Sequence, residues 1–156
     1  MCDYSLCGLP NRLAVEGEEL MVHKFGTGTV GLASPIDLAR DRVTVSPRKG
    51  FWQSIKSMFE DPAGSSRVTA VCVPPGAQLL LKNIPEGLQQ RWNVSEEETV
   101  FFVQLSANVN SHRDAMRFFN GTEALLQVLT EGILVRVLSL GEACPEDERH
   151  LAELTL

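Results

Sequence analysis

Four apolar runs of strand length follow one another in the second half of this chain, and they constrain its fold more than any other feature. They occupy residues 68–73, 78–84, 99–105 and 133–140. Turn-forming residues separate them, as Pro74-Pro75-Gly76 does between the first two. Short runs with such boundaries are typical of β-strands. We therefore expect residues 67–140 to form a β-rich unit.

The last run, residues 133–140, is apolar on both sides of a strand. Its side chains alternate between the two faces, with Ile133, Val135 and Val137 on one and Leu134, Leu138 and Leu140 on the other. Strands that are apolar on both sides are normally covered on both sides. We therefore expect both faces of this strand to be covered, and we take the pattern as an indication of association with another protein chain.

Residues 111–131 admit two interpretations. Ser111 with Asp114 forms a helix capping box, and residues 122–130 are rich in helix formers. Asn120-Gly121 between two apolar runs is instead a strong hairpin signal. We favour strands, which makes residues 114–140 a three-stranded meander with a second turn at 130–132. The helical alternative stays open at this point.

The glycines at positions 26, 28 and 31 spell G-x-G-x-x-G, the pattern of a dinucleotide-binding loop. Such a loop opens a helix, but a helix beginning here would meet Pro35 within about two turns, and proline disrupts a helix interior. The pattern therefore favours a hairpin, with strands at 20–25 and 29–33 joined by a three-residue loop.

Two helices are expected before residue 61. Ser34 and Pro35 suit the N-cap and the first position of a helix, which a predicted strand at 43–45 keeps short. Residues 51–60 carry apolar side chains at helical spacing, which predicts an amphipathic helix. Trp52 lies at the edge of its apolar side. This helix is our candidate for docking a partner, through Phe51, Trp52, Ile55 and Phe59.

The whole chain, residues 1–156, is expected to form one domain. It has a mixed N-terminal part (1–66), a β-rich part (67–140) and an acidic tail (141–156) in which Pro145 begins a short terminal helix. The predicted fold class is α+β and mostly β: an antiparallel barrel or sandwich with one amphipathic helix at 51–60 and the short terminal helix.

Charge and composition exclude some partners and indicate a location. The formal net charge of −6 provides no attraction for nucleic acid, and no run is apolar and long enough to span a membrane. We therefore expect a soluble, cytoplasmic protein without a nucleic-acid partner. In the reducing cytoplasm its four cysteines are expected to be thiols.

A metal site is one candidate for chemistry. Cys2 and Cys7 are close in sequence, and His23 and Cys72 complete a set of three thiolates and one imidazole, which suits tetrahedral zinc. The spacing supports the site only in part, because His23 and Cys72 are isolated in the sequence. Ordinary packing of buried cysteines is the competing interpretation.

The sequence contains no arrangement of acids, bases and nucleophiles that would indicate an enzyme. The favoured function is a non-enzymatic binding or assembly module with a protein partner, either another copy of the chain, as a homo-oligomer, or a different protein. The alternative is a metal- or thiol-dependent site at Cys2, Cys7, His23 and Cys72, and zinc is the cofactor it would hold. A third possibility is a small ligand in the mouth of a barrel.

Overall fold

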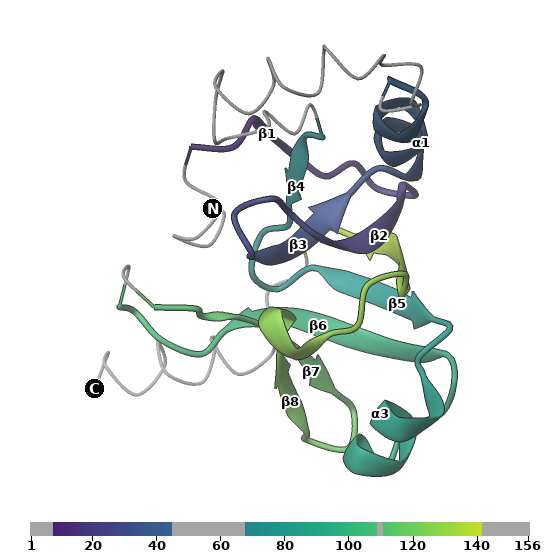
Figure 1. Ribbon diagram of the computed structural model, residues 1–156. Helices are drawn as coiled ribbons and strands as arrows, with labels where there is room; N and C mark the ends of the chain where they lie inside the picture. The colour runs from purple at the N-terminus through teal and green to yellow at the C-terminus, as the bar shows by residue number, and fades with distance from the viewer. Residues whose placement is uncertain (1–7, 45–67, 109–110, 142–156) are drawn as a thin grey trace, which may run out of the picture.

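The computed structural model describes residues 8–44, 68–108 and 111–141, and within them nine strands form a single sheet (Figure 1). The strands are β1 Asn11–Leu13, β2 Glu19–Lys24, β3 Val30–Ala33, β4 Ala70–Cys72, β5 Gln78–Lys82, β6 Glu98–Gln104, β7 Asp114–Phe118, β8 Glu123–Leu125 and β9 Leu134–Ser139. The helices are α1 Pro35–Thr44, α3 Glu86–Trp92 and the short 3₁₀ helix η2 Leu126–Val128.

The fold is α+β and mostly β, as the sequence predicted. The strand order is β1-β4-β3-β2-β9-β5-β6-β7-β8, and every neighbouring pair is antiparallel except the parallel pair of β1 and β4. The sheet stays open and does not close into a barrel. The helices predicted at 51–60 and in the tail lie outside the described residues. No helix in the described ranges is both long and apolar enough to cross a membrane.

The predicted hairpin at residues 20–33 is confirmed. The amide of Phe25 donates to the carbonyl of Thr29 at 2.8 Å, and Gly28, with φ +85°, turns the chain between β2 and β3. Gly31 lies inside β3, where it pairs with His23. The G-x-G-x-x-G pattern therefore reflects a tight turn and a strand, since no helix follows the second glycine directly.

Helix α1 begins where the sequence predicted but continues further. It starts at Pro35, and the amide of Leu38 donates to the carbonyl of Ser34 at 3.1 Å. The strand predicted at 43–45 is wrong for Val43 and Thr44, which are the last helical residues, and residue 45 is not described. Val43 is 75% exposed. Without a sheet surface to cover, its β-branched side chain does not impose an extended backbone.

The three strands predicted at 68–73, 78–84 and 99–105 are confirmed as β4, β5 and β6. Helix α3, which the sequence did not indicate, follows Pro85 and ends at Asn93 in the left-handed conformation (φ 53°). The Asn120 side-chain amide donates to the carbonyls of Trp92 and Asn93 at 2.9 and 3.0 Å. The end of α3 is thereby tied to the turn after β7.

Residues 111–131 contain strands, as favoured, joined at Asn120-Gly121. Gly121 has φ +86°, and its amide donates to the carbonyl of Phe118 at 3.0 Å. The predicted three-stranded meander is wrong, however, because β9 pairs with β2 and β5 and not with β8. Between β8 and β9 the chain forms η2, whose Gln127 side chain bonds both the amide and the carbonyl of Val30. This contact draws the chain across to β3, so β9 enters the sheet beside β2.

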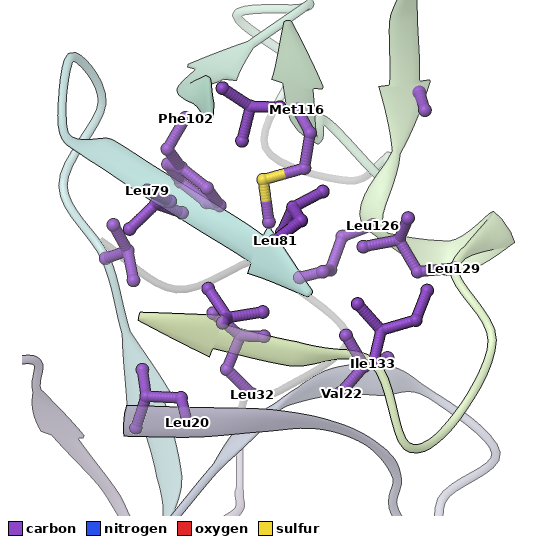
Figure 2. Close-up of a cluster of buried hydrophobic side chains, with 14 of the residues drawn as sticks. Leu20, Val22, Leu32, Leu79, Leu81, Phe102, Met116, Leu126, Leu129 and Ile133 are labelled. Carbon is purple, nitrogen blue, oxygen red and sulfur yellow. The ribbon is translucent and has the colours of Figure 1, made fainter. Parts of the chain in front are cut away.

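The main core lies on one face of the curved sheet, where strands β2, β3, β5, β6, β7 and β9 contribute buried side chains (Figure 2). The side chains that point toward one another there include Leu20, Val22, Leu32, Leu79, Leu81, Phe102, Met116, Leu126, Leu129 and Ile133. A smaller cluster lies on the opposite face, where Leu38 of α1 packs against Phe25, Ala33, Val68 and Ala70. Helix α1 thus covers that face only at the end of the sheet that carries β2, β3 and β4 (Figure 1).

Strand β9 is buried on one face only. Val135 and Val137 are fully buried in the main core, whereas Leu138 is 41% exposed and Arg136 is exposed. Within the single chain the second face of β9 is partly exposed, so the expectation that both faces are covered stays a prediction. The chain has no element in the described ranges that packs over Leu138 as α1 packs over Ala33.

Candidate functional site

Two of the four predicted metal ligands, His23 and Cys72, lie in the described residues. They belong to β2 and β4, which are separated in the sheet by β3. Cys2 and Cys7 lie outside the described residues, so the predicted set of four stays a prediction. Within residues 8–44, 68–108 and 111–141, no group of three or more His, Cys, Asp and Glu side chains could hold a metal ion.

His23 is held by Glu131, which the sequence did not associate with it. The Nδ1 atom of His23 lies 2.9 Å from Oε1 of Glu131, and the same oxygen accepts a hydrogen bond from the amide of Lys24 at 3.0 Å. The imidazole ring also meets the edge of Phe25, with ring centroids 4.9 Å apart. Carboxylate-bound imidazoles occur in catalytic and metal sites. Here the contact joins β2 to the turn that precedes β9.

Cys72 departs from the expectation that the cysteines are thiols. Its side chain is disulfide-bonded and only 6% exposed. Cys2, Cys7 and Cys144 lie outside the described residues. The thiolate is the form of cysteine that binds metal or attacks as a nucleophile. A disulfide-bonded Cys72 does not offer that form.

The candidate docking helix, with Phe51, Trp52, Ile55 and Phe59, also lies outside the described residues, and its docking role stays a prediction. The described part of the chain has a different apolar surface, on which two members are exposed and two are half-buried. It lies on the outer face of β9, β5, β6 and β7, opposite the main core. Its members are Leu80, Phe101, Phe119 and Leu138, which we call the outer strip.

Strand alternation places each member of the outer strip on the same face. Leu80 lies between the buried Leu79 and Leu81, so its side chain points away from the core. Phe101 is flanked in the same way by Val100 and Phe102. The outer strip therefore follows from the same periodicity that builds the core.

Phe119 is the most prominent member of the outer strip. It follows the buried Phe118 at the end of β7, and it is 70% exposed. Its ring meets Phe101 edge to face, with centroids 5.6 Å apart. Aromatic residues are enriched at protein interfaces, and an exposed aromatic side chain that belongs to an apolar patch marks a candidate contact surface.

Charged residues of both signs lie beside the outer strip. Nε of Arg117 lies 2.8 Å from Oε1 of Glu123 on the neighbouring strand β8. At the other side, Arg136 of β9 pairs in register with Glu19 of β2. These four residues contribute no net charge, so this face differs from the acidic molecule as a whole, which carries a net charge of −6.

The outer strip has a clear boundary along β6 and β7. Val103 and Ala115 pair across these strands on the same outer face, and both are buried. Val103 and Ala115 thus separate the outer strip from the exposed Leu105, which follows β6 and is 43% exposed.

The ion pair between Arg12 and Glu18 also contacts the backbone. Arg12 binds Glu18 through both of its terminal nitrogens, and Oε2 of Glu18 also accepts a hydrogen bond from the amide of Val15 at 3.1 Å. Hydrogen bonding to Arg12 lowers the pKa of the Glu18 carboxyl from its ordinary value. All these contacts hold the turn between β1 and β2.

Comparisons with protein-family models, curated proteins and solved structures found no match to this chain.

Sequence reasoning missed the outer strip although a signal for it was present. Thr99 to Gln104 alternate in the manner of a half-buried strand, which puts Phe101 opposite to Val100 and Phe102. The sequence of residues 99–104 predicts only a strand, because sequence alone does not say which face of a strand another element covers.

Proposed function

We propose that this protein is a non-enzymatic assembly module that binds a second copy of itself through the outer strip. The observation that carries the proposal is Phe119, which is 70% exposed yet held edge to face against Phe101. An aromatic side chain already fixed by a neighbour loses little conformational freedom on binding, and such residues are frequent energetic centres of interfaces.

The charge pattern supports a second copy as the partner. The whole chain is acidic, so two molecules repel each other over most of their surfaces. At the outer strip, Arg117 is paired with Glu123 and Arg136 lies beside Glu19. An apolar surface with balanced flanking charges can meet an identical surface without a charge penalty, as a twofold symmetric interface requires.

The test is the molar mass in solution, measured by size-exclusion chromatography with light scattering over a range of concentrations. We expect the wild-type chain to approach twice its mass of 17.2 kDa. Replacing Phe119 with Ser (Phe119→Ser) should raise the dissociation constant at least tenfold, because hot-spot truncations cost roughly 1.4 kcal/mol or more.

Val43→Ser is the matched control, since Val43 is an exposed apolar residue on α1 away from the outer strip. It should leave the dimer intact. A wild-type chain that stays monomeric at every concentration contradicts the proposal, and so does a Phe119→Ser variant that dimerises as well as the wild type. In either case the outer strip would not be a self-association surface.

The other functional interpretations from the sequence stay predictions. The zinc or thiol site at Cys2, Cys7, His23 and Cys72 is the alternative, and the disulfide bond of Cys72 weighs against it, because a disulfide offers no thiolate. A ligand in a barrel mouth has less support, because the sheet is open and its concave face is filled by large side chains such as Leu81, Phe102 and Met116. The absence of a nucleic-acid partner and the cytoplasmic location also stay predictions.

A further inference from the structure

The Asn120 side chain, in the turn between β7 and β8, ties this turn to the end of α3. Its Nδ2 atom donates to the carbonyls of Trp92 and Asn93 at 2.9 and 3.0 Å, and its Oδ1 atom accepts from the amide of Thr122 at 2.9 Å. The two carbonyls belong to the C-terminal end of α3, where a helix leaves its last carbonyls without partners in the helix. Asn120 therefore caps α3 from a distant part of the chain.

The same turn holds Phe119 in the outer strip. The ring of Phe118 packs against Trp92, with centroids 5.5 Å apart, and the amide of Phe118 donates to the carbonyl of Thr122 at 2.9 Å. Phe119 thus lies between two residues that are tied to α3, Phe118 by its ring and Asn120 by its side-chain amide. Loss of the Asn120 bonds would release one of these two attachments.

Asn120 is followed by Gly121, and this pair is chemically labile. Glycine has no Cβ to hinder ring closure, so the backbone nitrogen of Gly121 can attack Cγ of Asn120. The bond from Cγ to Nδ2 breaks, ammonia leaves with the proton of the Gly121 amide, and a five-membered succinimide forms. Water then opens the ring at either carbonyl, which gives aspartate or isoaspartate. Water is the only co-reactant.

We propose that Asn120 is a site of non-enzymatic deamidation, and that its conversion to a carboxylate weakens self-association through the outer strip. The effect on association rests on the proposed function. The folded turn slows the chemistry, because the Gly121 amide is bonded to the carbonyl of Phe118 at 3.0 Å and the Asn120 side chain is fixed to α3. Ring closure therefore proceeds when the turn opens locally.

A carboxylate at position 120 reverses the interaction with α3. It has no hydrogen to donate, so it would place a negative charge against the carbonyls of Trp92 and Asn93. It also adds one negative charge to a chain whose formal net charge is already −6, which increases the repulsion between two copies. Isoaspartate in addition lengthens the backbone by one methylene between Phe119 and Gly121.

The first measurement follows the modification in the full chain. One sample is kept folded and another is unfolded in guanidinium chloride, both in the same mildly alkaline buffer, and both are cleaved after Lys and Arg at intervals. Asn120 is the only asparagine in the peptide 118–136, so fragment mass spectra locate the change. We expect deamidation in both samples, at least tenfold slower in the folded one, which corresponds to about 1.4 kcal/mol of local opening.

Equal rates in the two samples would overturn the protection by the turn. A folded sample that stays unmodified after the unfolded sample has reacted completely would overturn the site.

The second measurement uses Asn120→Asp, which reproduces one product directly. Its dissociation constant, from light scattering over a range of concentrations, should be at least tenfold above that of the wild type. Amide exchange at Val94 should also become faster, because the Val94 amide donates to the carbonyl of Gln89 at the end of α3 that Asn120 caps. Asn83→Asp is the matched control: it adds the same charge at an exposed position after β5 and should change neither quantity.

The readouts separate this inference from the proposed function. A dimeric wild type with an equally dimeric Asn120→Asp overturns the link between Asn120 and the outer strip and leaves the proposed function standing. Unchanged exchange at Val94 overturns the same link. A monomeric wild type overturns the proposed function and the effect on association, whereas the deamidation rates still decide the site. Aged wild-type protein, separated by ion exchange into amide and acid forms, gives the same comparison if Asn120→Asp does not fold.

Discussion

At the scale of single residues, several polar side chains act as braces, which means that they hydrogen-bond to backbone groups and hold two segments of the chain together. Glu131 receives hydrogen bonds from β2, 107 residues away from it at Lys24. The Asn120 amide closes the end of α3, and Arg12 with Glu18 holds the turn after β1. Each brace satisfies backbone groups that the strands leave free, which is a structural role.

The Glu18 brace leads to a prediction about pH. Its hydrogen bond with Arg12 lowers the pKa of the Glu18 carboxyl in the folded state. In the unfolded chain the pKa of a glutamate carboxyl is about 4.3. The brace therefore stabilises the fold at pH values above the unfolded pKa, and the stabilisation is lost as pH falls through the folded pKa.

Glu18→Gln should lower the free energy of unfolding by roughly 0.5–1 kcal/mol at pH 7, a small value because both side chains keep contact with solvent. Urea unfolding at several pH values measures it. The difference from wild type should shrink below about pH 4. Glu97→Gln, at an exposed position, is the control. A difference that is constant with pH would contradict the assignment to the carboxylate.

At the scale of elements, η2 decides where the last strand goes. The Gln127 side chain imitates a strand neighbour: its oxygen accepts from the Val30 amide at 3.0 Å and its nitrogen donates to the Val30 carbonyl at 2.8 Å. The Gln127 side chain thus provides hydrogen-bond partners for the amide and the carbonyl of Val30, as a neighbouring strand would. The chain between β8 and β9 is thereby fixed on the β3 side of the sheet.

Gln127→Glu tests this role because it keeps an acceptor for the amide of Val30 and removes the donor to its carbonyl. We expect a loss of about 1–3 kcal/mol in stability, since a part-buried carbonyl loses its partner and faces a carboxylate. Amide hydrogen exchange should become faster at Val30 and in η2. Unchanged exchange at Val30 would show that Gln127 does not hold the two elements together.

At the scale of the whole molecule, the two faces of the sheet have different roles. The concave face carries the main core (Figure 2), and the outer face is covered by α1 at one end and exposed at the outer strip. Stability should therefore depend on the concave face, and association on the outer strip.

Matched leucine substitutions measure this division. Leu81→Ala, at a fully buried position, should cost about 2–5 kcal/mol in unfolding free energy, because it removes apolar contacts and leaves a cavity. Leu13→Ala, at a position 67% exposed on β1, should change stability by less than about 0.5 kcal/mol. Denaturant unfolding at low protein concentration is the measurement. Similar costs for the two variants would contradict the assigned core.

The sequence by itself determined the local features of this protein. Turns at Gly28 and Asn120-Gly121 depend on a positive φ that few residues adopt, and the start of α1 depends on Ser34 and Pro35. The strands followed from apolar runs of the right length. These features are encoded within a few neighbouring residues, so they could be predicted without knowledge of the rest of the chain.

Only the tertiary structure decided the position of β9 and the location of the candidate site. Residues 133–140 are apolar on both sides, so their pattern suits a place beside β8 as well as between β2 and β5. Contacts between residues far apart in sequence, such as Gln127 with Val30 and Glu131 with His23, made the choice. The same holds for the outer strip, because exposure depends on which element covers a face, and α1 covers only one end of the sheet.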